Sequence, residues 1–378
     1  MIPYSRQEIG DDDVRAVSKV LRSAFLTQGP AIKEFEDSLT KYTSARYCVA
    51  FSSGTAALHG AYHAAGIGSG DEVIVPGLTF AATANAALYL RAKPVFADIN
   101  PETGNIDVRD VEKKITKKTK MIVPVDYAGL PVDLYALRRL AKKHRLIIIE
   151  DAAQGLGASY KGKKLGTQAD MTMFSFHPVK SITTGEGGAI LTNDRRYYER
   201  LVMFRTHGLT RDPKKLKNKK HAAWHQEMQI LGYNYRLTDM QAALGVSQMK
   251  KLDRFIAKRR VAAKRYFELL KNVPGITLPP RTGLKNSAWH LFVVRIHPRV
   301  RDRVFEKLRA AGIGVQVHYL PVYLHPYYSA LGYRKGLCPE TEKFAASCIS
   351  IPLFPSITKK EQAFVVQKLT SILKTYEK

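Results

Sequence analysis

The strongest constraint on the fold is a series of short, largely apolar segments that alternate with stretches of helical spacing. Such segments occupy residues 47–51, 73–76, 95–98, 121–125, 146–149 and 171–176. Between two of them, apolar side chains recur every three or four positions, as at Leu134, Leu137, Leu140 and Ala141. Apolar strands separated by helices predict an α/β fold with a mostly parallel sheet covered on both faces. Such a sheet binds its ligands at the carboxyl ends of its strands.

The pattern changes after residue 236. Residues 242–271 carry apolar side chains between Lys and Arg, which predicts one long amphipathic helix or two abutting helices. Beyond them we expect strands at 290–296 and 315–319 and a helix at 300–311. The chain of 378 residues is long enough for two domains. We place an N-terminal arm and large domain at residues 1–245, and a linker helix and small α+β domain at 246–378.

Composition indicates an ordinary globular protein. The sequence contains no run of ~18 apolar residues that could cross a bilayer, and the N-terminus shows no secretory signal pattern. The three cysteines, Cys48, Cys338 and Cys348, form no CxxC pair. We therefore expect a cytoplasmic protein with reduced thiols and no membrane partner.

The net charge is unusual. Lys and Arg number 60 against 33 Asp and Glu, a formal charge of +27, and the excess is concentrated near residues 113–120 and 211–220. A nucleic-acid surface is one interpretation, but no RRM, KH or zinc-finger pattern accompanies the charge. A solvated basic face that steers an anionic small substrate fits better, so we expect no nucleic-acid partner. The role of residues 211–220 stays open.

Two histidine pairs have a spacing that could bind a metal. His59 with His63, and His221 with His225, are each four residues apart. Neither pair encloses the Glu of an HExxH motif, and no third ligand is evident, so we expect no metal site.

A lysine follows the predicted strand at 171–176. This strand delivers Ser175 and, a few residues later, Lys180. A lysine at a strand end can form a Schiff base once burial and its neighbours let it lose its proton. Taken alone, Lys180 fits an exposed loop lysine better, since most lysines lie in such positions.

Two acids end the apolar segment at 146–149. Glu150 and Asp151 belong at the same carboxyl edge as Lys180. A carboxylate there can pair with a cationic ring nitrogen, as pyridoxal 5'-phosphate (PLP) requires. Asp151 could instead cap the N-terminus of a helix, and taken alone both interpretations stay open.

A third strand end carries the sequence Ser53-Gly54-Thr55. Backbone N–H groups and hydroxyls at the start of the following helix could cradle a phosphate. The alternative is an ordinary strand-to-helix turn with a serine cap. A phosphate cradle, a ring-nitrogen carboxylate and an amine at three strand ends together predict one PLP site.

The motifs are similar to those of the DegT/StrS-type nucleotide-sugar aminotransferases, PLP enzymes of the aspartate-aminotransferase-like fold (fold type I). The similarity extends over nearly the whole chain, with motifs at residues 26–30, 53–58, 76–85, 150–154, 175–180, 185–188, 232–238 and 317–321. It implies a large, mostly parallel-sheet domain that binds PLP and a smaller C-terminal α+β domain. It also implies a homodimer whose active sites are shared across the interface.

The resemblance assigns roles to the cofactor contacts. It implies that Lys180 forms the Schiff base with PLP and that Asp151 pairs with the pyridine nitrogen. Phe80 would stack on the ring, although a buried core aromatic is the alternative, and Gln154 would lie near the 3-hydroxyl or the other side of the cofactor. The implied phosphate contacts are Gly54, Thr55, Ser175 and, from the neighbouring subunit, Asn234.

The resemblance also suggests a substrate. Tyr319, His318 and Arg236 correspond to positions that touch the sugar nucleotide, with a structural role as the alternative. The segments 125–129, 176–180, 182–186 and 316–319 are most similar to family members of pseudaminic acid biosynthesis. Those enzymes transfer an amino group from L-glutamate to C4 of a UDP-linked 4-keto-6-deoxy-N-acetylhexosamine.

Three alternatives remain. Another aminotransferase of the family would act at C3 or C4 of a dTDP- or GDP-linked keto sugar. A sugar dehydratase of this superfamily would carry His where Lys180 stands. A PLP-binding regulator that uses the positive charge would need a separate DNA-binding module, for which the chain has no room.

Overall fold

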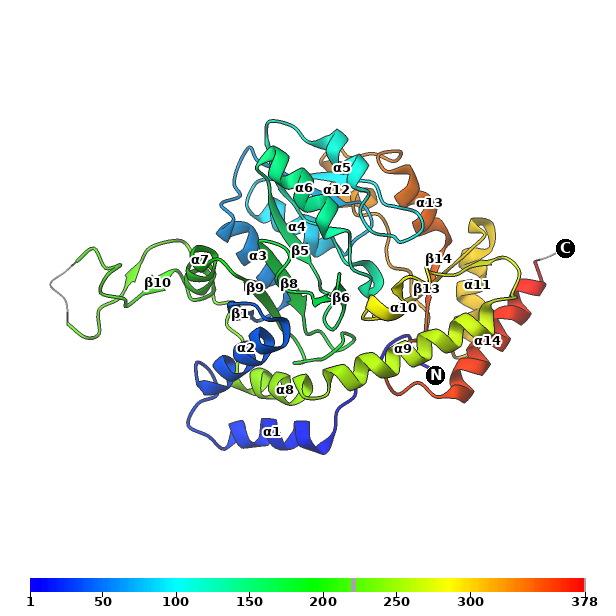
Figure 1. The fold of residues 1–378 in the computed structure, drawn as a ribbon, viewed down its shortest axis with the longest axis horizontal. Coiled ribbons are helices and arrows are strands. Elements are labelled where there is room, and N and C mark those ends of the chain that lie inside the picture. The colour runs from blue at the N-terminus through cyan, green and yellow to red at the C-terminus, as the bar shows by residue number, and fades with distance from the viewer. Residues whose placement is uncertain (219–221, 377–378) are drawn as a thin grey trace.

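A computed structural model describes residues 1–218 and 222–376 (Figure 1). Its centre is a seven-stranded sheet with the strand order β1-β9-β8-β5-β4-β2-β3. The strands are β1 (Tyr47–Phe51), β2 (Glu72–Pro76), β3 (Lys93–Ala97), β4 (Thr119–Ile122), β5 (Ile147–Asp151), β8 (Met171–Ser175) and β9 (Gly188–Thr192). Only β9 runs antiparallel to its neighbours, which confirms the predicted mostly parallel sheet.

Helices cover both faces of this sheet (Figure 1). Alternate residues of each strand belong to different cores: Ile74 and Ile148 pack with one set of helices, and Val75 and Ile149 with the other. The first set contains α2 (Pro30–Thr43), α5 (Val108–Lys114), α6 (Leu134–His144) and α8 (Asp239–Met249). The second set contains α3 (Gly54–Ala64), α4 (Ala81–Tyr89) and α7 (Arg195–Arg205). Strands buried on both faces explain the continuous apolar segments of the sequence.

The C-terminal part has its own sheet and core. The helical pattern at 242–271 forms two abutting helices, α8 and α9 (Leu252–Leu270), one of the two predicted arrangements. The predicted division after residue 245 falls within α8. A three-stranded sheet follows, with β12 (Ile276–Thr277), β13 (Phe292–Ile296) and β14 (Cys348–Ile351). The helices here are α10 (Gly283–Asn286), α11 (Pro298–Ala310), α12 (Pro326–Ala330), α13 (Pro339–Ser347) and α14 (Lys359–Lys374).

The predicted strand at 315–319 is wrong. This segment makes only an isolated bridge, between Gln316 and Ser350. His318 and Tyr319, joined by a cis peptide bond, then leave the sheet edge and line a cavity. The apolar alternation of the segment reflects core packing without strand pairing, because Val315 belongs to the C-terminal core and Val317 packs against a smaller apolar cluster. The 3₁₀ turn η2 (Val322–Leu324) follows.

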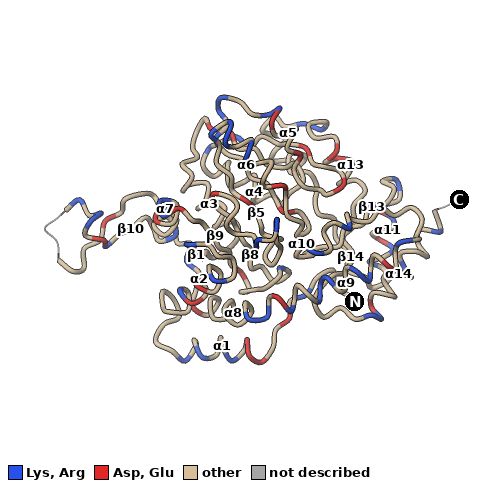
Figure 2. Tube along the Cα trace, in the orientation of Figure 1, with Lys and Arg blue, Asp and Glu red and all other residues tan. Residues whose placement is uncertain are grey.

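A hairpin projects from the body beside α7 (Figure 1). Its short strands are β10 (Leu209–Thr210) and β11 (Glu227–Met228). The basic segment 211–220 belongs to this hairpin, but Lys219 and Lys220 lie outside the described residues. Positive charge is also spread over the rest of the chain (Figure 2).

Four further elements complete the fold of the described residues. They are α1 (Asp11–Leu21), η1 (Tyr127–Gly129), β6 (Ser159–Tyr160) and β7 (Lys163–Lys164). All three cysteines are buried and unpaired. Among the described helices, none has the length and apolar character that crossing a membrane requires.

Candidate active site

A cavity of about 550 Å³ lies at the carboxyl ends of β1, β2, β5 and β8. Most of the residues predicted for the site line it: Gly54, Thr55, Phe80, Asp151, Gln154, Ser175, Lys180, His318 and Tyr319. They come from segments far apart in the sequence, and the parallel sheet brings them together because its strand ends share one edge.

Lys180 and Asp151 form the charged centre of this cavity. Lys180 follows β8 in a turn in which its N–H donates to the carbonyl of His177 at 2.9 Å. Burial lowers the pKa of Lys180 to about 8, although the nearby charge of Asp151 acts in the opposite direction. An amine with this pKa is partly unprotonated at neutral pH and can act as a nucleophile.

Asp151 is held in place by two hydrogen bonds. Thr83 donates its hydroxyl to Oδ2 at 2.7 Å, and the N–H of Ala153 donates to Oδ1 at 3.2 Å. Burial raises the pKa of Asp151, while the Thr83 hydrogen bond is the largest opposing effect. Turns rather than a helix follow β5, so the capping alternative for Asp151 is wrong.

The phosphate cradle predicted at residues 53–55 is the N-terminus of α3. The Ser53 hydroxyl caps the helix by accepting from the N–H of Ala56 at 3.1 Å. Within the described chain, the N–H groups of Gly54 and Thr55 donate to no protein acceptor. A side chain at position 54 would lie 3.3 Å from Cβ and Oγ of Ser175 and would fill the space beside these donors. Free N–H groups, a helix dipole and hydroxyls suit a phosphate.

Hydrogen bonds connect three residues that line the cavity, Gln154, His318 and Tyr319, to their surroundings. The Gln154 amide accepts from the N–H of Ala128 at 2.7 Å and donates to the hydroxyl of Tyr319 at 2.8 Å. His318 shares a hydrogen bond of 2.8 Å with the hydroxyl of Ser350, which links it to β14. Burial lowers the pKa of His318 to about 3, so its ring is neutral and adds no charge to the site.

Phe80 lies at the start of α4 and lines the same cavity. Its side chain is 61% exposed, so the alternative of a buried core aromatic is wrong. The ring is tilted toward Tyr319, with 6.0 Å between the ring centroids. An exposed aromatic ring at a cavity wall offers a face on which a planar ring can stack.

Two further carboxyl groups lie close to Asp151. Asp126, just beyond β4, and Glu150 are fully buried, and their carboxyl groups interact electrostatically. Each carboxyl group accepts one hydrogen bond, Asp126 from the N–H of Val132 and Glu150 from the hydroxyl of Thr172. Burial raises the pKa of both carboxyl groups, and the charge of Asp151 acts in the same direction, so a negative charge on either group is disfavoured.

Asn234 and Arg236 do not reach this cavity within one chain. Arg236 lines a different cleft, with Lys33, Glu36 and Arg205. Asn234 is exposed and forms an isolated bridge with Thr206. The prediction for Asn234 concerns the cofactor of a neighbouring subunit, which a single chain does not test.

The histidine pairs have structural surroundings. His63 stacks on Phe204, and burial lowers the pKa of His59 to about 4. His221 lies outside the described residues. The described part of the chain contains no group of three or more His, Cys, Asp or Glu side chains that could hold a metal ion.

The donor set fits PLP. A phosphate would occupy the cradle at α3, a planar ring would lie on Phe80, a pyridine nitrogen would meet Asp151, and an aldehyde would meet the Lys180 amine. Each feature is present in the protein alone: free N–H groups, an exposed ring, a fixed carboxylate and a lysine of lowered pKa.

Comparison with known proteins agrees with this arrangement. The sequence pattern of the DegT/DnrJ/EryC1/StrS aminotransferase family matches residues 7–370. The "UDP-4-amino-4,6-dideoxy-N-acetyl-beta-L-altrosamine transaminase" of Campylobacter jejuni (strain 81-176) is 40% identical, covering 100% of this chain and 99% of that protein.

Two solved structures share the whole fold. Helicobacter pylori PseC, an "aminotransferase involved in the biosynthesis of pseudoaminic acid", superposes with a TM-score of 0.93 at 34% identity over 99% of both chains. The PLP form of the putative sugar aminotransferase Spr1654 of Streptococcus pneumoniae also has a TM-score of 0.93, at 29% identity over 100% of both chains.

Proposed function

The chain belongs to the DegT/DnrJ/EryC1/StrS aminotransferase family and is a PLP-dependent aminotransferase of nucleotide sugars, and from this premise we propose its reaction. It transfers the amino group of L-glutamate to C4 of a UDP-linked 4-keto-6-deoxy-N-acetylhexosamine, as in pseudaminic acid biosynthesis. The observation that carries the chemistry is the meeting of Lys180, Asp151 and the α3 cradle in one cavity.

PLP, when bound, supplies an electron-accepting ring and an aldehyde that carries the amino group between substrates. Lys180 would hold the cofactor covalently and, once displaced by the substrate amine, would move the proton at the substrate carbon through Nζ. Asp151, fixed by Thr83, would keep the proton on the ring nitrogen. The cradle at Gly54 and Thr55 would hold the phosphate while the amine of Lys180 is released.

The names of two relatives support the choice of sugar. The Campylobacter protein is named for an amino-dideoxy-N-acetylhexose linked to UDP, and PseC for pseudaminic acid biosynthesis. Each covers essentially the entire chain, so the similarity is not limited to the cofactor site. Tyr319 and His318 line the cavity beside Phe80, and we propose that they contact the sugar.

The proposal includes a homodimer in the cytoplasm. Asn234 is exposed and outside the cavity of its own chain, which suits a contact with the cofactor phosphate of a second subunit. We also propose that Arg236 contacts the nucleotide sugar. The partners are then the sugar nucleotide, L-glutamate and a second copy of the chain, without nucleic acid or membrane.

A substrate panel tests the proposal. Purified holoenzyme is given L-glutamate and UDP-, dTDP- or GDP-linked 4-keto sugars, with a 3-keto sugar as a separate arm, and the amino sugar and 2-oxoglutarate are measured. We expect the highest kcat/KM for the UDP-linked N-acetyl sugar and transfer to C4. A dTDP or GDP sugar used at least tenfold better would overturn the substrate assignment.

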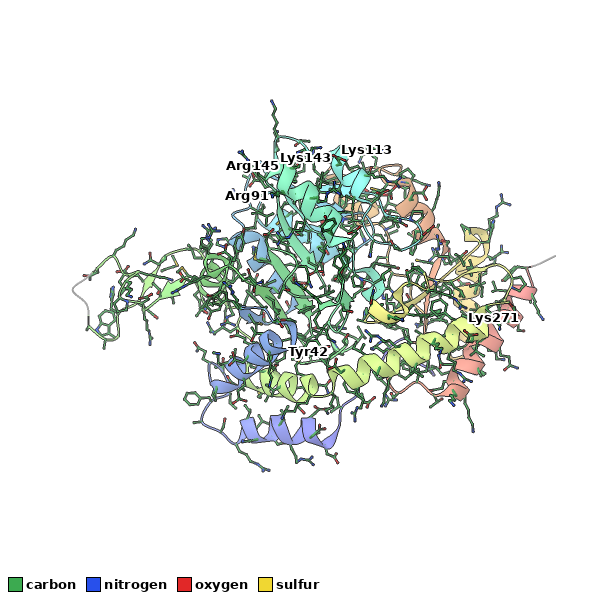
Figure 3. The ribbon with its side chains drawn as sticks, viewed as in Figure 1. Tyr42, Arg91, Lys113, Lys143, Arg145 and Lys271 are labelled. Atoms are coloured by element: carbon green, nitrogen blue, oxygen red, sulfur yellow. The ribbon has the colours of Figure 1, made fainter. Side chains whose placement is uncertain are left out.

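A matched variant separates substrate choice from chemistry. Lys180→Ala is expected to abolish transfer to every sugar, by about 10³-fold or more, and to remove the visible absorbance of covalently held cofactor. Lys271→Ala, at an exposed lysine directly after α9 (labelled in Figure 3), is the control. Turnover by Lys180→Ala at the normal rate would contradict the role of this lysine.

A further inference from the structure

A second cavity, of about 890 Å³, lies at the opposite edge of the sheet from the active site. It includes Glu72 and Lys93, the first residues of β2 and β3, and Thr116, which precedes β4. The active-site cavity lies at the other ends of the strands and shares no lining residue with it. A five-residue strand is about 16 Å long, so the two cavities are separate sites.

The rim of this cavity is strongly cationic. One carboxylate, that of Glu72, stands against six cations: Arg91, Lys93, Lys113, Lys114, Arg334 and Lys335. Figure 3 labels Arg91 and Lys113, both in the upper part of the molecule. The local excess of five positive charges contrasts with the active-site cavity, whose lining contains Lys180 together with the carboxylates of Asp151 and Glu186.

Only some of these cations have partners in the protein. Lys93 lies 3.7 Å from Glu72, and Lys114 lies 3.1 Å from Asp110. Arg334 donates to backbone carbonyl groups of its own loop, which leaves its charge uncompensated.

The other three cations of this cavity have no such partner in the described part of the chain. Arg91, Lys113 and Lys335 are exposed, and within residues 1–218 and 222–376 they form neither an ion pair nor a side-chain hydrogen bond. Like charges around one cavity repel each other, and a multivalent anion bound there would offset this repulsion.

The floor of the cavity is apolar and partly aromatic. It consists of Leu88, Ala92, Pro94, Val95, Phe96, Tyr333 and Leu337. The Tyr333 hydroxyl donates to the carbonyl of Pro94 at 2.5 Å, and its ring meets the Phe96 ring edge-on at 5.1 Å. These contacts fix the segment 331–337 against the edge strand β3, so the wall that carries Arg334 and Lys335 is anchored.

We propose that this cavity is a second nucleotide site, which binds a nucleoside diphosphate independently of the reaction. The phosphates would lie among Arg91, Lys113 and Lys335, and the planar base would lie on the floor near Tyr333. The volume is within the usual range for small-ligand sites. An inorganic anion would leave the apolar floor in water, and an uncharged apolar ligand would leave the cations unpaired. This inference does not rest on the substrate proposed above.

Hydrogen–deuterium exchange with UDP as the probe tests the site, because UDP could also enter the active site and the method tells the two apart. With holoenzyme we expect UDP to slow exchange in peptides covering residues 91–96 and 331–337, separately from any change at 53–56 and 175–180. Inorganic pyrophosphate alone tests binding to the cations of the rim, and uridine alone tests binding to the apolar floor. Both should bind more weakly than UDP.

A double variant with a matched control completes the test. Lys113→Gln with Lys335→Gln should raise the Kd for UDP at this cavity about tenfold or more, because two charged contacts are lost, without changing the kcat of transamination. Lys359→Gln with Lys360→Gln removes the same charge from exposed positions on α14 and should change the Kd less than about twofold.

Three results would overturn the inference. The first is protection by UDP confined to the active-site peptides. The second is an equal loss of affinity in both double variants, which would reflect overall charge alone. The third is pyrophosphate binding as tightly as UDP, which would mean that the floor does not bind the base.

Discussion

At the scale of single residues, the pKa of Lys180 governs how readily the protein takes up its cofactor. Its amine is mostly protonated below pH 8 and mostly free above it. Because only the free amine reacts with an aldehyde, we expect the rate of PLP uptake by the apoenzyme to rise with pH around a midpoint near 8. Stopped-flow absorbance at several pH values measures this midpoint.

The same experiment tests the neighbour of Lys180. Asp151 raises the pKa of Lys180 through its charge, so Asp151→Asn should shift the uptake midpoint to lower pH. Asp37→Asn, at an exposed position on α2, should leave the midpoint unchanged. An unshifted midpoint in Asp151→Asn would show that the two groups do not interact.

The buried acid pair makes a prediction about stability. Burial raises the pKa of Glu150 to about 7 from its usual 4.5. Between these pH values the unfolded chain releases this proton and the folded chain keeps it, so the stability contributed by this group falls as the pH rises to about 7. Glu150→Gln cannot ionise, and its melting temperature should therefore decline less between pH 5 and pH 7.

Thermal unfolding at pH 5, 6, 7 and 8 measures this difference. Glu102→Gln, on an exposed turn, is the control and should follow the wild-type curve. Parallel curves for wild type and Glu150→Gln would mean that burial does not raise the pKa of Glu150 in the folded state.

Much of the candidate site could be predicted from residues and their order. Lys180, Asp151 and Gly54 each follow an apolar segment, and strand ends in a parallel sheet meet at one edge. Their placement together is observed, while their roles stay predictions. Asp126 follows β4 and obeys the same rule, but its burial against Glu150 depends on side-chain directions that the sequence does not specify.

At the scale of elements, the start of β9 determines the shape of the cradle. A Cβ at Gly188 would lie 2.6 Å from the carbonyl oxygen of Ser53 and 2.8 Å from the backbone of Gly54. Because backbone atoms cannot yield as a side chain can, Gly188→Ala should displace the start of α3. We expect a lower melting temperature and at least about tenfold weaker PLP binding, measured by equilibrium dialysis.

Gly68→Ala is the matched control for this variant. No atom lies within 4 Å of a Cβ built at Gly68. This variant should keep the wild-type melting temperature and affinity for PLP. Normal PLP binding by Gly188→Ala would mean that the cradle tolerates a shift of α3.

The sequence predicted the central sheet well and the wall of the active site poorly. Apolar strands such as β1 and β8 are buried on both faces, so their pattern is unambiguous. The segment 315–319 shows alternation of the same kind, but its valines are buried by core packing, and the segment makes only an isolated bridge to a strand. Local pattern alone does not distinguish the two causes of burial.

At the scale of the whole molecule, shared active sites would allow two inactive variants to restore each other. Lys180→Ala removes the amine, and Asn234→Asp would place a negative charge beside the neighbouring subunit's phosphate. In a refolded equal mixture, half of the dimers contain one chain of each kind, and each of these has one intact site. We therefore expect about a quarter of wild-type activity in the mixture and almost none in either variant alone.

The measurement is the specific activity before and after mixing, with dimers confirmed by size-exclusion chromatography. Mixing Lys180→Ala with wild type under the same conditions is the control for subunit exchange. No recovery in the mixture of variants, despite proven exchange, would contradict a site shared between subunits. The sequence indicated this sharing only through resemblance, since no local pattern reveals which residues a second chain covers.

The hairpin has a consequence for newly made protein. Trp224, Met228 and Leu231 on or beside it are largely exposed in one chain. If the second subunit covers these side chains in the proposed dimer, each newly synthesised chain exposes an apolar hairpin surface until it dimerises. Until then the chain also lacks a complete active site. The lag between synthesis and activity would then shorten as expression rises.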